Sequence, residues 1–396
     1  MANVSGVSQA RSSARTGRFV SIGVGDEMAR AWVPPPLPPQ PPVDLDGLMP
    51  LIEQANRALG RLDGITSILP SPPLFLFMYV RKEALLSSQI EGTQSSLSDL
   101  LLFENDEIPQ AAIADVEEVS NYVAAMNYGL QRLREQFPLS LRLIREIHDI
   151  LLRKGRGSSK QPGEFRRTQN WIGGTRPGNA LFVPPPPNEL AGCLDDFEKF
   201  LHDDRTPTLI RAALAHVQFE TIHPFLDGNG RLGRLLITFL LCADGALKDP
   251  MLYLSLYFKQ RRKQYYDLLQ SVRERGDWES WIEFFLTGVV ETANEAVETA
   301  RQLFTLFEQD REQIRALGRS AGSMLRVHDL LQRQPIIGIL PASKQLKVTH
   351  PTVMKALANL QDLKIVHEIT GRRRGRLFAY RRYMNILNRG TEALKD

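Results

Sequence analysis

One stretch decides the fold of this chain: His223-Pro224-Phe225-Leu226-Asp227-Gly228-Asn229-Gly230-Arg231-Leu232-Gly233-Arg234. The proline-free run before it, residues 209–222, has apolar residues at helical intervals, so we expect a helix that ends at His223 and is stopped by Pro224. The apolar period resumes after Arg231, which predicts a tight turn at 228–230 that opens a second helix. The sequence therefore predicts two consecutive helices joined by a short glycine-rich loop.

The loop has the composition of an anion site. Free N–H groups and the positive dipole end at the start of the second helix favour phosphate. Arg231 and Arg234 lie three residues apart, so both guanidiniums can bind phosphate oxygens. Asp227 suits Mg²⁺, which takes few protein oxygens, and His223 is a candidate general base for an incoming hydroxyl. Each residue alone is explained by an ordinary turn or a solvated face, but the set favours chemistry on a polyphosphate. The chain has no Walker-type loop ending in Gly-Lys-Ser/Thr.

The pattern His-Pro-Phe-x-Asp-Gly-Asn-Gly-Arg-x-x-Arg resembles, at every position, the signature of the Fic family of nucleotidyltransferases. The resemblance implies a mainly α fold, a helical core with a short β-hairpin flap, that transfers AMP from ATP to a Ser, Thr or Tyr hydroxyl of a target protein or of itself and releases pyrophosphate. It implies the following roles: His223 deprotonates the hydroxyl, Asp227 holds Mg²⁺, Gly228, Asn229, Gly230 and Arg231 hold the α- and β-phosphates, and Arg234 holds the γ-phosphate. Members that phosphorylate carry lysine in place of Gly230, so glycine favours AMP transfer here.

A second motif, Ser87-Ser88-Gln89-Ile90-Glu91-Gly92, resembles the Fic inhibitory motif. It lies in a helix predicted over residues 74–102 and interrupted near Gly92. A glutamate brought to Arg234 would form a bidentate pair and occupy the place of a γ-phosphate. For a single glutamate a solvated helix position is the usual explanation, but the two motifs together favour Ser87 and Glu91 as inhibitory residues within the same chain. In some relatives the same glutamate supports removal of AMP, and the sequence leaves that second activity open.

Two further regions are candidates for substrate contacts. Short apolar runs within residues 163–183 predict a β-hairpin or extended flap, whose edge could pair with a target segment. The resemblance puts Ile172 and Gly173 near that target, and an ordinary hairpin packed on helices is the alternative. The candidates for the nucleoside pocket are Gln218, Gln260, Tyr265 and Tyr266, the last three on one predicted helix. Core or surface roles explain these four residues equally well or better.

The carboxy-terminal part predicts a different unit. After a long charged helix, residues 292–317, two short helical stretches, 341–346 and 351–363, surround a turn. Two strand-like runs follow around an arginine-rich tip, which gives the outline of a winged helix-turn-helix. Arg372, Arg373 and Arg374 could contact DNA phosphates, while Thr349, His350, Thr352 and Lys355 could face a groove. Protein docking or dimerisation is the equal alternative, so DNA and a homodimer both stay open.

The predicted division of the chain is as follows: residues 1–45, a flexible Ser/Arg- and Pro-rich segment; 46–115, a helical region with the inhibitory helix; 116–290, the catalytic core; 291–320, a linker helix; 321–396, the winged-helix unit. The 43% hydrophobic and 24% charged content suits a globular intracellular enzyme, and we expect a cytoplasmic location. Two cysteines, Cys193 and Cys242, argue against a disulfide framework. No apolar run approaches the roughly 20 residues of a membrane span.

Two functions therefore compete. The first is an autoinhibited protein adenylyltransferase that uses ATP and Mg²⁺, and the second is a DNA-binding regulator whose Fic-like core senses nucleotide. His223 separates them, because a sensor needs the phosphate cradle but no general base.

Overall fold

The two predicted helices around the signature form the centre of the fold. The structure is a computed structural model that describes residues 15–25, 27–68, 72–105, 111–318 and 321–393. Helix α8 (Thr208–Ile222) is buried along its whole length from Leu209, and α9 (Asn229–Ala243) is buried at nearly every position. Helices without a polar face must be enclosed by other elements. Helix α8 ends at His223 as the sequence predicts, while α9 begins at Asn229, so Asn229 and Gly230 of the predicted turn belong to the first turn of the helix.

The enclosing helices come from both sides of the signature in the sequence. They are α3 (Pro72–Ile90), α5 (Ile113–Arg134), α6 (Leu141–Leu151), α7 (Pro187–Leu201), α10 (Ser255–Gln260) and α11 (Arg262–Arg275). Helices α5 and α9 approach so closely that a Cβ atom on Gly129 would lie 2.4 Å from Cζ of Phe239. The single predicted helix that would carry Gln260, Tyr265 and Tyr266 is wrong, because the chain breaks at Arg261 (φ −119°, ψ 38°) into α10 and α11.

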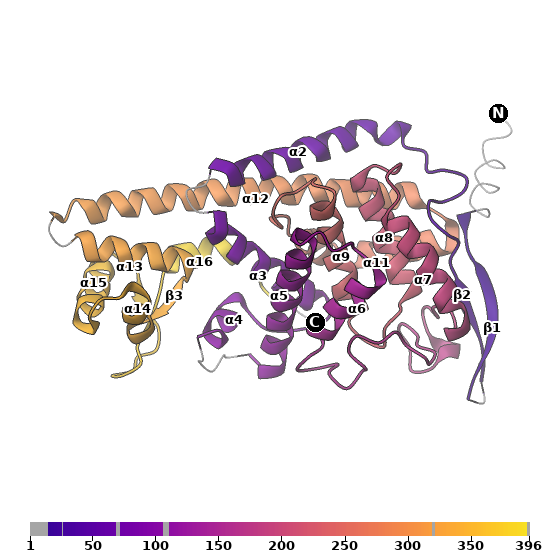
Figure 1. The fold of residues 1–396 in the computed structure, drawn as a ribbon, viewed down its shortest axis with the longest axis horizontal. Coiled ribbons are helices and arrows are strands. Elements are labelled where there is room, and N and C mark those ends of the chain that lie inside the picture. The colour runs from indigo at the N-terminus through magenta and orange to yellow at the C-terminus, as the bar shows by residue number, and fades with distance from the viewer. Residues whose placement is uncertain (1–14, 26, 69–71, 106–110, 319–320, 394–396) are drawn as a thin grey trace.

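A long helix, α12 (Trp278–Arg315), connects the core to the carboxy-terminal unit (Figure 1). It begins in the core, where Asp277 caps it by accepting a hydrogen bond from Ser280 N and where Trp281 Nε1 donates to Ala213 O (2.9 Å). Helix α2 (Met49–Ile68), which follows the short 3-10 helix η1 (Asp46–Leu48), lies along α12. The boundary predicted at 290/291 therefore cuts a continuous helix, as the boundary at 115/116 cuts α5.

The amino-terminal segment is not flexible throughout. Strands β1 (Arg18–Val24) and β2 (Glu27–Val33) pair antiparallel, and Trp32 N donates to Val183 O (2.8 Å), so the hairpin is attached to the core. The prediction of a flexible segment over 1–45 is wrong for these strands, because Val20, Ile22 and Val24 are partly buried in alternation with exposed residues, the two-residue period of a strand. The proline-rich stretch that follows also contacts the core, because Pro35 O accepts from Gln218 Nε2 (2.8 Å). Residues 1–14 lie outside the described residues.

The helix predicted over 74–102 with an interruption near Gly92 is confirmed. Helix α3 ends at Ile90, Gly92 has a φ of 100°, and α4 (Leu97–Phe103) begins after a capping box of Ser96 and Asp99. Glycine adopts positive φ without the strain of other residues, so the chain can turn sharply directly after Glu91.

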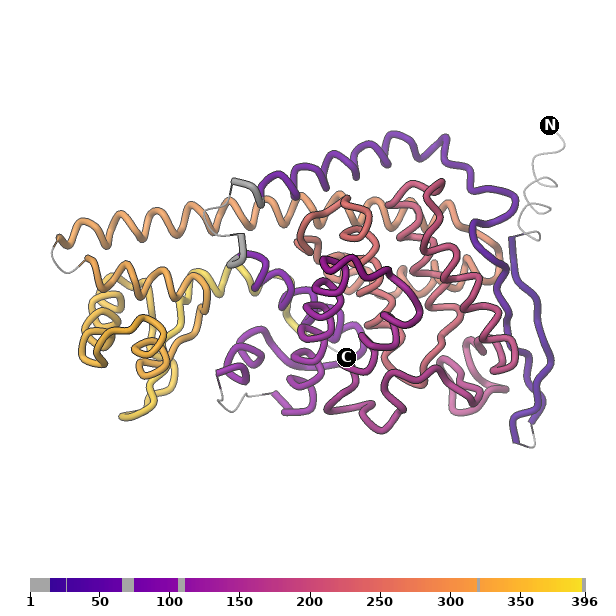
Figure 2. The backbone as a smooth tube through the Cα atoms, in the orientation of Figure 1, coloured from indigo at the N-terminus to yellow at the C-terminus, as the bar shows by residue number. Residues whose placement is uncertain are grey.

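The carboxy-terminal unit has a helix-turn-helix followed by two strands, in the predicted order. Its elements are α13 (Ala321–Arg333), β3 (Ile336–Gly338), α14 (Ile339–Leu346), α15 (His350–Asp362), β4 (His367–Glu368) and β5 (Leu377–Ala379), with an antiparallel sheet of order β3-β5-β4. Helix α16 (Arg381–Leu387) packs on α12, where Arg382 and Tyr380 both contact Asp310. The chain then returns to the helical core, as the yellow end of the tube in Figure 2 shows.

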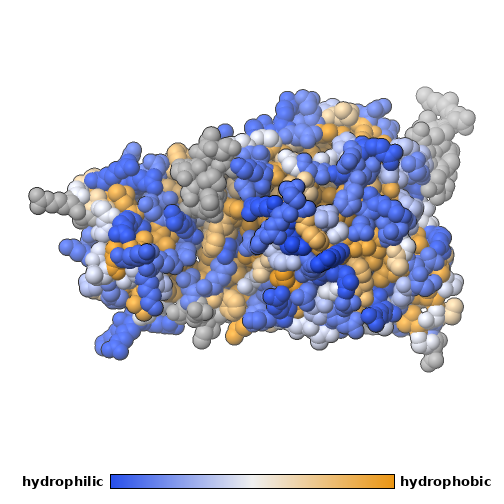
Figure 3. Space-filling view, in the orientation of Figure 1, coloured by the Kyte–Doolittle hydropathy of each residue, from blue (hydrophilic) through white to orange (hydrophobic). Residues whose placement is uncertain are grey.

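The visible face carries hydrophilic residues over both the core and the carboxy-terminal unit, with hydrophobic residues in separate patches (Figure 3). Among the described residues, no helix combines the length and apolar character needed to cross a membrane.

Candidate active site

His223 occupies a left-handed position at the end of α8 (φ 48°, ψ 60°). Its carbonyl oxygen accepts hydrogen bonds from Arg166 Nε (2.9 Å) and Asn170 Nδ2 (3.3 Å), which hold this uncommon conformation. Burial, with the nearby Arg273 guanidinium second, lowers the pKa of the imidazole to about 3. The ring is therefore neutral at pH 7 and has a lone pair available for a proton.

The loop after His223 is closed by Asn229. The Asn229 side chain accepts from Phe225 N and donates to Phe225 O, both at 2.9 Å. Asp227 Oδ1 accepts from Gly228 N (2.6 Å), and Gly228 (φ 77°) starts α9 in a conformation that favours glycine. The side chain of Asn229 thus shapes the turn, and the backbone N–H groups of the first turn of α9 are the groups able to meet an anion.

A carboxylate already lies over this turn. A Cβ atom on Gly230 would be 2.2 Å from Oε1 of Glu91, so Glu91 and the first turn of α9 are in direct contact. Arg234 Nη2 lies 2.6 Å from the same oxygen, while Arg234 Nε donates to Ser87 Oγ (2.8 Å) and Nη2 donates to Ser87 O (3.0 Å). The structure therefore brings together Ser87, Glu91, Gly230 and Arg234 from two distant parts of the chain.

This ion pair shifts the pKa values of both Glu91 and Arg234. Burial opposes the charge of Glu91, but the Arg234 guanidinium outweighs burial and lowers the pKa of the carboxyl. Burial likewise disfavours the charged form of Arg234, but Glu91 together with Tyr265, Tyr266 and Glu220 outweighs burial, so the pKa of the guanidinium is raised. Arg234 is 2% exposed, so it is a buried cation that needs a partner.

Arg231 is paired with a residue that the sequence analysis missed. Its Nη1 lies 2.6 Å from Oε1 of Glu118 on α5, and its Nη2 lies 3.5 Å from Oδ1 of Asp227. Burial raises the pKa of the Glu118 carboxyl, and Arg231 partly opposes that effect. A signal was present in the sequence, because helical spacing puts Glu118 on the same face as the buried Tyr122 and Met126.

Asp227 fits the needs of Mg²⁺ bound together with phosphates. Its side chain is 35% exposed, and its nearest guanidinium nitrogen is 3.5 Å away, so an oxygen remains accessible to a cation. No cluster of three or more His, Cys, Asp or Glu side chains suited to a metal occurs among the described residues. A single carboxylate suits Mg²⁺, which retains several waters and takes phosphate oxygens as ligands.

The four nucleoside candidates lie in different environments. Tyr265 is 1% exposed and contacts His216 Nε2 through its hydroxyl (2.8 Å), while Tyr266 beside it is 41% exposed. Burial, followed by the charge of Glu91, raises the pKa of Tyr266 to about 12, so this phenol belongs to the surroundings of the Glu91 site. Gln218 is bonded to the proline-rich segment, and Gln260 is exposed at the end of α10.

The predicted flap is an open loop with one β-bridge, between Ile172 and Phe182, and a 3-10 helix, η2 (Pro177–Asn179). Gly173 is exposed with a φ of 69°, and Leu181 is 80% exposed. Phe182 lies under the Arg273 guanidinium, 4.0 Å from its Cζ, and Arg273 Nη2 donates to Glu220 O (3.0 Å). Arg273 thus connects the flap to the last turn of α8, a role that the sequence analysis did not assign.

A second buried carboxylate, Glu220, lies one helical turn before His223. Its Oε2 is 4.0 Å from Nδ1 of His223, and its Oε1 is buried without a hydrogen-bond partner among the described residues. Burial raises the pKa of this carboxyl to about 7, with Arg234 opposing the shift. Glu220 precedes the signature and belongs to no motif, so the sequence alone gave no signal for it.

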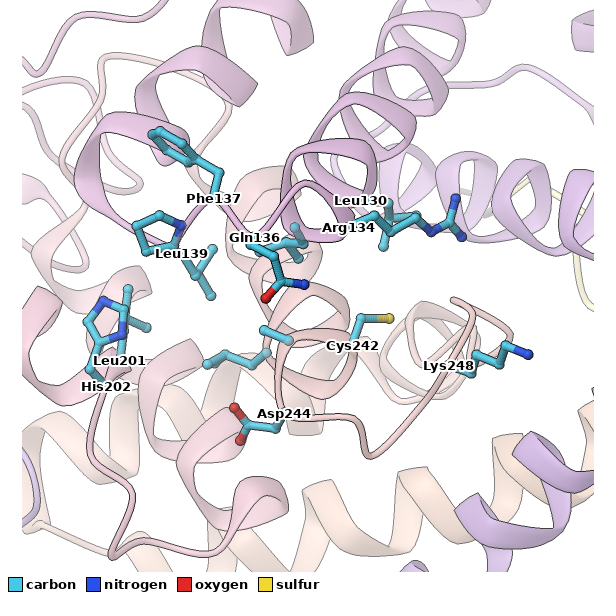
Figure 4. Close-up of a pocket in the computed structure, with 14 residues that line it drawn as sticks. Leu130, Arg134, Gln136, Phe137, Leu139, Leu201, His202, Cys242, Asp244 and Lys248 are labelled. Atoms are coloured by element: carbon cyan, nitrogen blue, oxygen red, sulfur yellow. The ribbon is translucent and has the colours of Figure 1, made fainter.

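Other candidate residues lie outside this site. Thr349, His350, Lys355 and Arg372, Arg373 and Arg374 are exposed on the carboxy-terminal unit, and Thr352 is partly buried, with its hydroxyl 2.8 Å from that of Thr349. A cavity of about 430 Å³ opens beside the ends of α5 and α9 (Figure 4). Its lining includes Arg134, His202, Cys242 and Lys248 and none of the signature residues.

Two family models match the chain. Residues 49–131 match the model described as Fic/DOC family N-terminal, and residues 138–241 match the model described as Fic/DOC family. The first range contains Ser87 and Glu91, and the second contains the whole signature.

Curated relatives with the name protein adenylyltransferase Fic match half of the chain. The protein from Drosophila grimshawi is 34% identical over 200 residues, 49% of this chain and 38% of the relative, and that from Drosophila melanogaster is 32% identical over 200 residues, 49% and 37%. The chain thus spans less than two fifths of the length of these relatives.

Solved structures share the fold. A Fic family protein from Desulfovibrio desulfuricans G20 gives a TM-score of 0.56 at 19% identity, covering 86% of this chain and 97% of that one. A Fic domain containing signaling protein from Bacteroides thetaiotaomicron VPI-5482 gives 0.50 at 20% identity, covering 63% and 97%. The likeness to both structures concerns the fold.

The Glu91–Arg234 pair predicts a pH-dependent stability. Because folding lowers the pKa of Glu91 below its ordinary value of 4.5, the pair stabilises fully above that value, and its contribution is lost as pH falls through the lowered pKa. We expect Glu91→Gln to reduce the free energy of unfolding by about 1–2 kcal/mol at pH 7, and the difference from wild type to shrink below pH 4.5. Urea unfolding of both proteins between pH 3 and 7 measures this difference in the free energy of unfolding. Glu53→Gln, which removes an exposed pair with Arg57, should change little at any pH.

Proposed function

We propose that this chain, which belongs to the Fic/DOC family, is a protein adenylyltransferase that transfers AMP from ATP to a hydroxyl of a target protein and is inhibited by its own Glu91. One observation carries the proposal. The Glu91 carboxylate lies on the first turn of α9, against Gly230 and Arg234, and its charge also acts on the neutral His223. An anion, two buried arginines and a base therefore share one site, as transfer of a phosphate-bound group requires.

The proposed reaction is a displacement at the α-phosphorus. The hydroxyl oxygen of the target forms a bond to the α-phosphorus, its proton passes to the imidazole of His223, and the bond from the α-phosphorus to the bridging oxygen breaks to release pyrophosphate. Backbone N–H groups at the start of α9, with Arg231 and Arg234, stabilise the phosphate charge. Mg²⁺, held by Asp227, would neutralise charge on the phosphates. His223 is suited to this role because its ring is neutral at pH 7.

Inhibition follows from competition for one guanidinium. Arg234 would bind the γ-phosphate, but Glu91 holds it at 2.6 Å and Ser87 accepts two further hydrogen bonds from it. ATP can adopt the productive position only after Glu91 leaves, since both anions need the same donors and the same space above Gly230. Removal of AMP from a modified target, with Glu91 assisting water, is a second activity of the same residues that we keep open.

The target would be a segment with a Ser, Thr or Tyr hydroxyl, presented at the loop around Ile172 and Gly173. The backbone of Ile172 is bonded within the loop, to Leu181 and Phe182, so a target segment would meet the exposed residues beside it, Gly173 and Leu181. Self-modification is part of the proposal. The cytoplasmic location and the homodimer stay predictions.

A DNA-binding regulator with a nucleotide-sensing core is the second candidate. The exposed Arg372, Arg373 and Arg374 between β4 and β5 favour it. A sensor has no use for the neutral imidazole of His223 beside the phosphate site, so we place the enzyme first.

Labelled ATP tests the enzyme. With Mg²⁺ and α-labelled ATP, wild type should label itself weakly, Glu91→Gly should label itself at least about tenfold more because Arg234 is released, and Glu91→Gly/His223→Ala should give no label. Label from γ-labelled ATP would indicate phosphorylation instead. If the Glu91→Gly protein transfers AMP neither to itself nor to a cell lysate, the proposed function is wrong.

A mobility-shift assay tests whether DNA binds to the wing, the loop of residues 369–376 between β4 and β5. Alanine at Arg372, Arg373 and Arg374 together should weaken binding to random duplex DNA by about tenfold or more at low salt, since each lost phosphate contact reduces affinity and its salt dependence. The matched control replaces Arg301, Arg311 and Arg315 on α12 by alanine. An unchanged shift with the wing variant would leave protein docking as the role of this unit.

A further inference from the structure

A glycine in the loop after α6 lies directly against Asp227. Gly157 has a φ of 90°, and a Cβ atom on it would be 2.7 Å from Oδ2 of Asp227. A side chain at this position would displace either the loop or the carboxylate. The loop therefore covers the side of the phosphate site where Mg²⁺ would bind.

The neighbouring residue, Arg156, reaches into the same site. Its Nη2 lies 3.3 Å from Oε2 of Glu118 and 3.5 Å from the backbone oxygen of Glu91, and its side chain is 54% exposed. Glu118 is 1% exposed and also holds Arg231 at 2.6 Å. One buried carboxylate thus lies between two guanidiniums, one of them buried and one facing solvent.

The ion pairs at this turn join three arginines to three carboxylates, and Glu220, which also acts on Arg234, makes no ion pair with these arginines. Arg156, Arg231 and Arg234 supply three positive charges, and Glu91, Glu118 and Asp227 supply three negative charges. Withdrawal of Glu91 leaves three positive and two negative charges. The contacts of Arg156 with Glu118 and Glu91 use Nη2, so its other N–H groups can meet a ligand.

We propose that Arg156 is a third phosphate-binding arginine, which contacts the β- and γ-phosphates of ATP and the departing pyrophosphate. The inference rests on the proposed function and extends its phosphate site beyond the signature. A guanidinium is suited to this role because its planar donors match two phosphate oxygens. Pyrophosphate gains negative charge as the bond to the α-phosphorus breaks, so a donor on that side lowers the barrier.

Calorimetry on the Glu91→Gly/His223→Ala protein tests this inference without turnover. With Mg²⁺ present, adding Arg156→Ala should weaken the binding of ATP and of pyrophosphate by about tenfold. The affinity for AMP should be unchanged, because AMP lacks the β- and γ-phosphates. Arg156→Lys should restore part of the loss. The control is Arg153→Ala. Arg153 lies three residues before Arg156, is exposed and pairs with Asp149 at 3.5 Å, so its loss should change none of the three affinities.

Two results would overturn the role of Arg156. An unchanged pyrophosphate affinity contradicts it, and so does an equal loss for AMP, which would indicate a general distortion of the pocket. In either case the proposed function stands if Glu91→Gly transfers AMP. If the Glu91→Gly/His223→Ala protein binds no ATP, the proposed function fails and this inference fails with it.

An independent observation concerns the end of the chain. Residues 388–393 return to the core and contact Gln89, two positions before Glu91. Gln89 is 1% exposed, its Nε2 donates to Thr391 O (2.9 Å) and Ser95 O (3.0 Å), and its Oε1 accepts from Lys259 Nζ (2.6 Å). The last turn of α3 is therefore held by the carboxy-terminal tail.

Lys259 completes this contact. It is 5% exposed and also donates to the backbone oxygens of Gly390 (3.3 Å) and Glu392. Gly390 fits closely, because a Cβ atom there would be 2.7 Å from Cδ1 of Leu256 on α10. The buried ammonium thus joins α10, the tail and the inhibitory helix through specific hydrogen bonds, whose loss leaves buried polar groups unpaired.

We infer that residues 389–393 act as a latch that keeps Glu91 on Arg234. The tail follows α16 directly, and α16 packs on α12 beside the carboxy-terminal unit. A ligand that moves this unit would withdraw the tail from Gln89 and release the last turn of α3. This inference also rests on the proposed function, since the latch controls inhibition of AMP transfer.

Truncation after Asn388 tests the latch. We expect self-labelling with α-labelled ATP to rise by about fivefold to tenfold over wild type, because loss of the hydrogen bonds to Gln89 shifts the equilibrium away from the inhibited state. Lys259→Met should have the same direction of effect. Neither change should raise labelling further in the Glu91→Gly background, since inhibition is already absent there. Lys199→Met, which removes an exposed pair with Asp195 on α7 and leaves the tail intact, should match wild type.

Thermal unfolding separates the latch from general damage. Lys259→Met remains a test of the latch if the truncated chain does not fold. If Lys259→Met is folded and labels itself no faster than wild type, while Glu91→Gly labels strongly, the latch is wrong and the enzyme stands. If Glu91→Gly is also silent, the proposed function itself is wrong.

Discussion

A buried guanidinium requires an anion, and this constraint organises the candidate site. Arg234 is 2% exposed on α9, which like α8 is buried at nearly every position, and a cation in such a place needs an anion beside it. Ser87 and Glu91 provide the partner in the structure, at 2.8 and 2.6 Å. The proposed switch follows from the same requirement, because a polyphosphate is the other anion that could meet it.

The loop between α8 and α9 fixes the backbone of His223. His223 holds a left-handed backbone that costs about 1–3 kcal/mol in a non-glycine residue, and Arg166 and Asn170 stabilise it through its carbonyl oxygen. Asn229 closes the turn through the backbone of Phe225. The strain and its support set the imidazole beside the start of α9, so the residues that pack the loop also position the proposed chemistry.

Much of the fold could be predicted from local patterns. The ends of α8 and α9, the break of α3 near Gly92 and the two helices of the carboxy-terminal unit follow from proline, glycine and apolar period, which act within a few residues. Three predictions failed because distant contacts decided the outcome. The exposed β1 is ordered by its pairing with β2 and by the hydrogen bond of Trp32 to Val183. Helix α12 continues through the predicted boundary because α2 and α8 pack along it. The chain breaks at Arg261, between α10 and α11.

By itself, the sequence determined the identity and order of the candidate groups: a histidine, a carboxylate, a glycine-rich helix start and two arginines within twelve residues, with a second glutamate motif far upstream. Their partners were decided by the tertiary structure. These contacts join residues from 38 to 302 positions apart in the chain. They are the contacts of Glu118 with Arg231 and Arg156, the hydrogen bond of Arg166 to the His223 carbonyl oxygen, and the hydrogen bond of Gln89 to the carboxy-terminal tail. Spacing along the chain carries no record of such pairs, because burial and charge select them only once the helices are packed.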